Sequence, residues 1–83
     1  MSHHFKVRIN DGAERDFATD AGMYVYAALA AVLADDELLP LPGADAPLHV
    51  EIWSPSLVPE YGPYHYLIHE VDRTIHIATA VRK

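Results

Sequence analysis

Residues 5–17 read FKVRINDGAERDF, and the first five of them alternate between apolar and basic side chains. Successive side chains of an extended strand point to opposite faces, so these two kinds of side chain separate onto two faces. One face then carries Phe5, Val7 and Ile9, and the other carries Lys6 and Arg8. This pattern predicts a half-buried strand in a sheet that packs one face against another layer and leaves its other face in solvent.

The rest of this stretch predicts a hairpin. The Asp-Gly dipeptide at 11–12 is a typical turn signal. A two-residue loop would mix the two faces, because it would place Val7 opposite Asp16. A three-residue loop would instead pair two apolar residues, Phe17 with Val7, and would place Asp16 opposite a basic residue. We therefore expect the longer loop, or a bulge.

The next segment predicts one helix that ends near Ala34. Thr19 or Asp20 can cap its first turn, because either side chain can accept a hydrogen bond from a free backbone N–H. Its large aliphatic residues recur at i, i+4, i+7 and i+8, which places on one side of the helix Val25, Leu29, Val32 and Leu33. We expect this stripe to face the core, with the neighbouring alanines letting the helix backbone sit close to a sheet.

Three consecutive carboxylates follow the helix, at Asp35, Asp36 and Glu37. A carboxylate at a helix C-terminus is unfavourable, because it faces the negative end of the helix dipole. Two interpretations account for them. In the first, the helix has already ended and Asp35 or Asp36 caps a short turn that leads into Leu38. In the second, the three carboxylates form an acidic contact patch for a partner.

The second half of the chain predicts three more strands. All six prolines lie between residues 40 and 63, which excludes a helix there. Residues 48–53 alternate in polarity as a strand does, and a proline-containing connection over 54–63 follows. This connection either packs over a sheet edge or is presented as a binding loop.

The last two strands form a second hairpin, for which we expect the turn at Asp72-Arg73. Counting outward from this turn pairs Ile68 with Ile77 on the core side of the sheet. The same count pairs His69 with His76 on the other side.

The predicted order β-β-α-β-β-β makes an α+β fold of two layers in a single domain over residues 1–83, with one helix packed on a mainly antiparallel sheet. One helix covers only one face of a sheet. The uncovered face is then expected to carry Lys6, Arg8, His49, Glu51, Trp53, His65, Leu67, His69 and His76.

The histidines of this uncovered face raise the question of a metal site. Zinc and copper accept imidazole nitrogen and carboxylate oxygen, so His49, His69 and His76 are the candidate ligands. The spacing of His65 and His69 fits no recognised metal motif, because four residues along a strand span about 13 Å. We therefore expect no metal and no other cofactor. The face is expected to hold a solvated polar pair, with a ligand site or a pH-sensitive contact as alternatives.

Charge is distributed unevenly along the chain, which has a formal net charge of −6. No lysine or arginine lies between Arg15 and Arg73, whereas ten carboxylates do. Such a surface repels nucleic-acid phosphates and anionic lipids, and it speeds encounter with basic protein surfaces. We therefore expect a basic protein or protein complex as the partner, and no direct binding to nucleic acid or membrane.

No motif in the sequence identifies a reaction. The chain has no cysteine, its serines lack the nucleophile-elbow pattern, and its four glycines are isolated rather than clustered as in a phosphate-binding loop. We expect no catalytic residues and no enzymatic activity. The N-terminus has no apolar signal region and no run is long enough to span a bilayer, so we expect a cytoplasmic protein.

The expected function is that of a small acidic, non-catalytic protein-binding module. By analogy of size and charge, it would act as an inhibitor that sterically blocks a basic, nucleic-acid-handling partner, as phage anti-CRISPR proteins do, or as an immunity protein does with a basic toxin. The alternative is a ligand- or metal-binding domain that uses the histidine face, either as a monomer or as a homodimer. Tyrosine, tryptophan and aliphatic anchors favour interfaces. The expected partner contacts are Asp35, Asp36, Glu37, Glu51, Trp53, Leu57, Val58, Glu60 and Tyr61.

Overall fold

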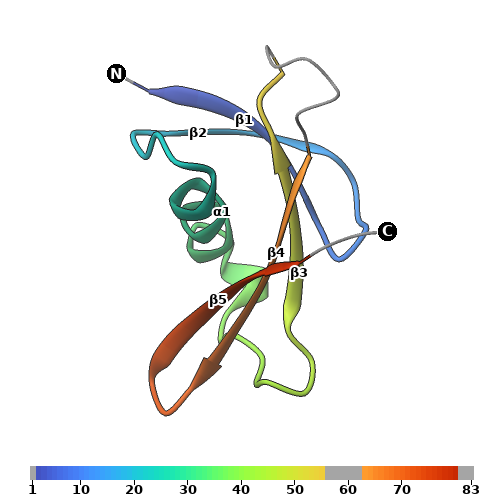
Figure 1. Ribbon diagram of the computed structural model, residues 1–83, viewed down its shortest axis with the longest axis vertical. Coiled ribbons are helices and arrows are strands. Elements are labelled where there is room, and N and C mark those ends of the chain that lie inside the picture. Colours follow the sequence, from blue (N-terminus) through green and yellow to red (C-terminus); the bar gives the residue numbers. More distant parts are fainter. Residues whose placement is uncertain (1, 56–62, 81–83) are drawn as a thin grey trace.

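The computed structural model describes residues 2–55 and 63–80, and it shows one α-helix packed on a five-stranded sheet (Figure 1). This confirms the predicted α+β class and the order β-β-α-β-β-β. Along the chain the elements are β1 (His3–Ile9), β2 (Arg15–Thr19), α1 (Tyr24–Leu33), the 3₁₀-helix η1 (Asp36–Leu38), β3 (Leu48–Trp53), β4 (Tyr64–Val71) and β5 (Thr74–Ala80).

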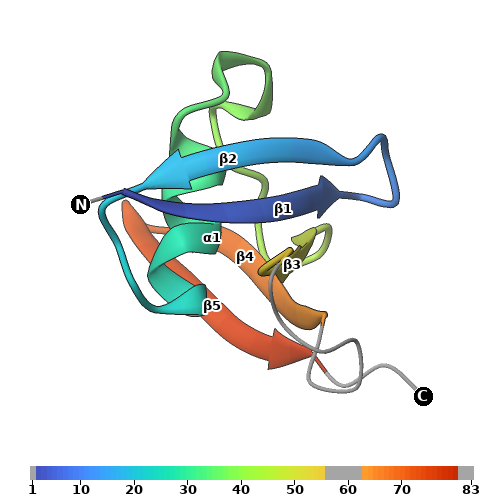
Figure 2. The ribbon, with the colours of Figure 1, turned by 90° about the horizontal axis from the view of Figure 1, so that it is seen from above.

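The strands lie in the order β2-β1-β3-β4-β5, and each neighbouring pair is antiparallel. The chain leaves β2, forms α1 and returns as β3 on the far side of β1. The sheet is strongly twisted, and α1 lies on its concave side between the β1–β2 hairpin and the β4–β5 hairpin (Figure 2). Neither helical segment of the described residues has the length and apolarity needed to cross a membrane.

The core lies between α1 and one face of the sheet. The predicted alternation is confirmed in β1, where the apolar side chains are buried and Lys6 and Arg8 point to the other face. The same face of the sheet continues through β3 and β4. Its buried residues are Phe5, Val7, Ile9, Leu48, Val50, Ile52 and Ile68.

The helix meets the sheet through its small residues, and here the predicted core stripe was wrong. Val32 is buried as expected, but Val25 and Leu29 are only half-buried on the flank of the helix and Leu33 is exposed. Alanine carries no atoms beyond Cβ, so a row of alanines lets the helix backbone approach the sheet more closely than leucines would. The buried helix residues are Ala27, Ala28, Ala31 and Val32.

The start of the helix also differs from the prediction. Residue 23, a methionine, occupies the N-cap position, and its side chain makes no capping hydrogen bond. The Thr19 hydroxyl instead accepts a hydrogen bond from the Ala21 backbone N–H at 3.2 Å, within the connection that precedes α1. The first turn of α1 therefore lacks a side-chain cap.

The register of the first hairpin differs from the expected three-residue loop. Phe17 lies opposite Phe5, and Asp16 lies opposite Lys6. The end of β1 turns away from β2 because Asn10 pairs with β3: its backbone N–H donates to the carbonyl of His49 at 2.8 Å, and its side-chain Oδ1 accepts from the His49 N–H at 3.0 Å. The observed register differs from the expected one by two residues, which preserves the faces of both strands, but Val7 now lies opposite Arg15.

The second hairpin has the predicted register. Ile68 lies opposite Ile77 and His69 lies opposite His76. The turn is at Asp72 and Arg73, whose φ angles of 49° and 66° are those of a type I′ turn.

Candidate functional site

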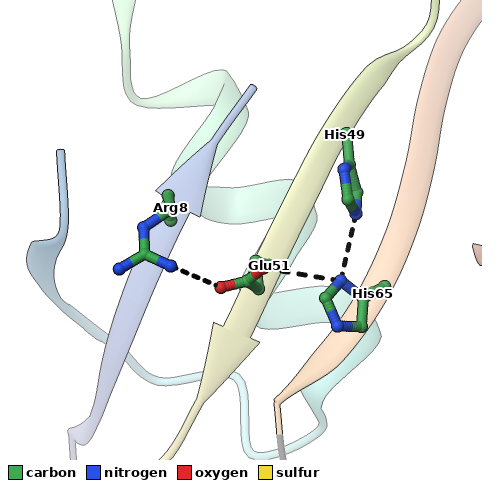
Figure 3. A network of polar contacts seen from close by, with 4 residues as sticks. All are labelled: Arg8, His49, Glu51 and His65. Atoms are coloured by element: carbon green, nitrogen blue, oxygen red, sulfur yellow. Dashed lines mark hydrogen bonds and ion pairs between the residues drawn. The ribbon is translucent and has the colours of Figure 1, made fainter. Parts of the chain in front are cut away.

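A row of charged and polar side chains crosses the uncovered face of the sheet, which we call the open face (Figure 3). The register of β1, β3 and β4 places Arg8, Glu51 and His65 side by side on adjacent strands. Glu51 is only 6% exposed, although it lies on the face of the sheet opposite α1. A buried carboxylate is costly unless it is paired, so its neighbours determine that cost.

Both oxygens of Glu51 have a basic neighbour. The Arg8 guanidinium donates a hydrogen bond to Oε2 at 2.8 Å, and the His65 Nδ1 lies 3.7 Å from Oε1. Arg8 also lies over the ring of Trp53, with 5.7 Å between the guanidinium carbon and the ring centroid. The predicted contact residues Glu51 and Trp53 thus belong to one internally paired cluster rather than presenting an unpaired charge to a partner.

The histidines of the open face form two separate pairs. His49 Nε2 lies 3.0 Å from His65 Nδ1, so that one ring donates and the other accepts. His69 and His76 stack with their ring centroids 5.0 Å apart. Among residues 2–55 and 63–80, no group of three or more metal-ligating side chains is arranged to hold an ion. The structure therefore does not gather the candidate ligands His49, His69 and His76 into one such group.

The acidic segment after α1 lies on the opposite side of the sheet, next to the helix. Asp35 is the N-cap of η1, where its carboxylate accepts from the Glu37 backbone N–H at 3.0 Å, as the first of the two interpretations predicts. It also accepts from Arg15 at 2.6 Å. The hydrogen bond from Arg15, followed by that from the Glu37 N–H, lowers the pKa of Asp35 below its ordinary value.

Asp36 and Glu37 remain exposed, and neither carboxylate pairs with a cation among the described residues. They stand at the rim of an open groove of about 470 Å³ between the C-terminal end of α1 and the β1–β2 hairpin. Val7, Ile9 and Phe17 lie along its sheet side. The remaining lining residues are Arg15, Asp16, Ala31, Ala34 and Asp35.

Sequence reasoning missed this groove, although part of its signal was present. The alternation in β1 placed Val7 and Ile9 on the helix side, and the acidic segment was recognised. The helix residues that lie beside Val7 and Ile9 were not predicted, because the helix was expected to face the sheet with other side chains. Reasoning from single residues also left His65 out of the metal candidates, although its register with Glu51 brings it into the open-face cluster.

The predicted contact residues therefore divide between two faces. Asp35, Asp36 and Glu37 lie on the helix side, whereas Glu51 and Trp53 lie on the open face. Four others lie outside the described residues: Leu57, Val58, Glu60 and Tyr61. In comparisons with family models, curated proteins and solved structures, nothing matches this chain.

Proposed function

We propose that this chain is a small acidic, non-catalytic protein-binding module that holds a basic segment of another protein in the groove beside α1. The observation that carries the proposal is the placement of Asp36 and Glu37, exposed and without an ion-pair partner among the described residues, in a groove that is also lined by the half-buried Phe17. The site would be used by a segment with an apolar side chain for the floor and lysine or arginine side chains for the rim.

The charge of the groove favours such a segment over a neutral one. Among the residues that the structure describes, the one basic side chain in its lining is Arg15, and this guanidinium already pairs with Asp35. The two remaining rim carboxylates stay hydrated in the free protein, so pairing them with exposed basic groups costs little desolvation. Specific contact then comes from burial of an apolar side chain against Phe17 and Ala34, the apolar lining residues that are not already buried in the core.

The whole-chain charge supports an inhibitory consequence of this binding. A partner that handles nucleic acid presents a basic surface, and a chain with net charge −6 is drawn to that surface. Once docked, the domain would occupy the path of the nucleic acid and exclude it sterically. This is the mode of action proposed here, of the anti-CRISPR or immunity-protein type.

A defined peptide tests the groove directly. The probe is a short synthetic peptide in which lysines flank a single leucine, and the readout is the change in backbone amide NMR shifts of the labelled protein. We expect the largest changes at Val7, Phe17, Asp36 and Glu37. A peptide with glutamine in place of each lysine should bind at least about tenfold more weakly, because it cannot pair with the carboxylates.

Two double variants separate the rim from the overall charge. Asp36→Asn with Glu37→Gln removes two charges from the groove, whereas Asp45→Asn with Asp72→Asn removes two charges outside its lining. The first pair should weaken peptide binding and the second should leave it nearly unchanged. Equal losses would mean that net charge alone attracts the peptide, and shift changes centred on Trp53 and His49 would place the site on the open face instead.

A further inference from the structure

The outer face of α1 is apolar, and several of its large side chains are exposed among the described residues. The helix reads YVYAALAAVL and carries no charged residue on any side. Tyr26 is 58% exposed and Leu33 is 43% exposed, and Met23 at the N-cap is 61% exposed. A helix that is apolar all round is normally buried all round, and a contiguous exposed apolar patch marks an interaction surface.

The outward residues follow the spacing of a helix-packing seam. Met23, Tyr26, Ala30 and Leu33 are related by steps of three, four and three residues, which is the a/d pattern of a coiled-coil stripe. The buried residues Ala27, Ala28, Ala31 and Val32 occupy the opposite side of the helix. The helix therefore packs one side against the sheet and carries a second apolar stripe on its other side. We call this stripe the second seam; it consists of Met23, Tyr26, Ala30 and Leu33.

We propose that this second seam forms a homodimer in which two copies of α1 pack antiparallel. The seam is self-complementary in this orientation: about a two-fold axis at Ala28, Met23 lies opposite Leu33 of the second copy, and Tyr26 lies opposite its Ala30. A large ring thus meets a small side chain, and a flexible thioether meets leucine, with each contact made twice by symmetry.

Charge also favours a second copy in this orientation. A basic partner would be attracted to carboxylates, but the seam has none. Antiparallel packing places the negative C-terminal end of each helix dipole beside the positive N-terminal end of the other. The first turn of α1 has no acidic residue and its last turn has no basic residue, so the helix's own side chains offset neither end.

This surface is distinct from the groove of the proposed function. The groove is lined by Ala31 and Ala34, on the flank of α1 that faces the β1–β2 hairpin. Dimerisation through the outer seam therefore leaves the two inferences separately testable.

Sedimentation equilibrium over a wide concentration range measures the self-association. We expect the unaltered chain to reach twice the monomer mass. Met23→Glu and Leu33→Lys, each at an exposed position, should each weaken the dimer by at least about tenfold, because each places a charge against an apolar side chain. An equimolar mixture of the two variants should recover association, since the introduced carboxylate and ammonium then lie opposite each other. Val71→Glu, at an exposed apolar residue on β4, is the matched control and should leave the dimer unchanged.

Three other outcomes would contradict the proposed dimer. A chain that stays monomeric at all concentrations excludes the dimer, and a dimer indifferent to both seam variants places its interface elsewhere. Single variants that dissociate without recovery on mixing exclude the antiparallel register. The Met23→Glu variant should still bind the lysine–leucine peptide; if it dimerises no longer but keeps that binding, the seam and the groove are shown to be independent.

Discussion

Glu51 is the residue whose environment is most unusual for its type. It is buried on the face of the sheet opposite α1, where Arg8 and His65 lie beside its two oxygens. Glu51→Ala should lower the free energy of unfolding by about 1–3 kcal/mol, since it leaves the partly buried Arg8 without its hydrogen-bond acceptor. Urea denaturation measures this loss. The control is Glu14→Ala, which removes an exposed carboxylate 3.6 Å from Lys6 and should change the free energy of unfolding by less than about 1 kcal/mol. If both variants lose the same stability, the buried cluster contributes no more than a surface ion pair.

Asp35 links β2 to the end of the helix through its pair with Arg15. Its pKa in the folded state is lowered from the ordinary value of 3.8, chiefly by the hydrogen bond from Arg15. The pair therefore stabilises the fold fully above that value, and this stabilisation is lost as the pH falls through the lowered folded-state pKa.

Replacing Arg15 tests this linkage. Arg15→Met should raise the pKa of Asp35 towards its ordinary value and should make the acid limb of the stability curve less steep. Carboxyl NMR titration follows the pKa, and Lys6→Met is the control because Lys6 pairs with Asp16 instead. An unchanged pKa of Asp35 in Arg15→Met would show that the N–H of Glu37 alone is responsible.

At the scale of elements, the orientation of α1 on the sheet is set by the side of the helix that carries its small residues. Ala28 faces the sheet without any exposure, whereas Ala30, two residues further along the helix, is only half-buried. Ala28→Leu should destabilise the fold by about 1–3 kcal/mol, because the added carbons must push the helix away from β3 and β4. Ala30→Leu, the same change on the outer side, should cost less than about 0.5 kcal/mol in samples dilute enough to be monomeric. Thermal unfolding of both variants checks this, and similar losses would contradict the observed orientation of the helix.

At the scale of the whole molecule, uneven charge governs how partners approach. An acidic surface that steers a basic partner should associate more slowly as salt rises, because exposed charges are screened beyond about 8–10 Å at physiological ionic strength. Stopped-flow mixing with the lysine–leucine peptide measures the association rate. Asp36→Asn with Glu37→Gln should reduce both the rate and its salt dependence. A rate that ignores salt would leave the charge asymmetry a role in solubility only.

The sequence by itself determined the class of fold and the faces of the strands. Alternation is a local property: whichever strand lies beside β1, Val7 and Ile9 stay on one face and Lys6 and Arg8 on the other. The register of the second hairpin was also predictable, because a two-residue turn fixes every pair beyond it. The uneven charge follows from the sequence alone as well.

Only the tertiary structure decided which side of the helix is buried, how the first hairpin pairs, and where the acidic residues lie. Periodicity cannot choose a buried side for a helix that is apolar all round, so close packing against the sheet selected the alanines. The register of the first hairpin depends on β3 as well as on β2, because Asn10 at the end of β1 forms hydrogen bonds with His49 of β3. The groove and the Arg8–Glu51–His65 row both join residues far apart in sequence, and contacts of that kind arise from strand order and helix placement, which no local pattern contains.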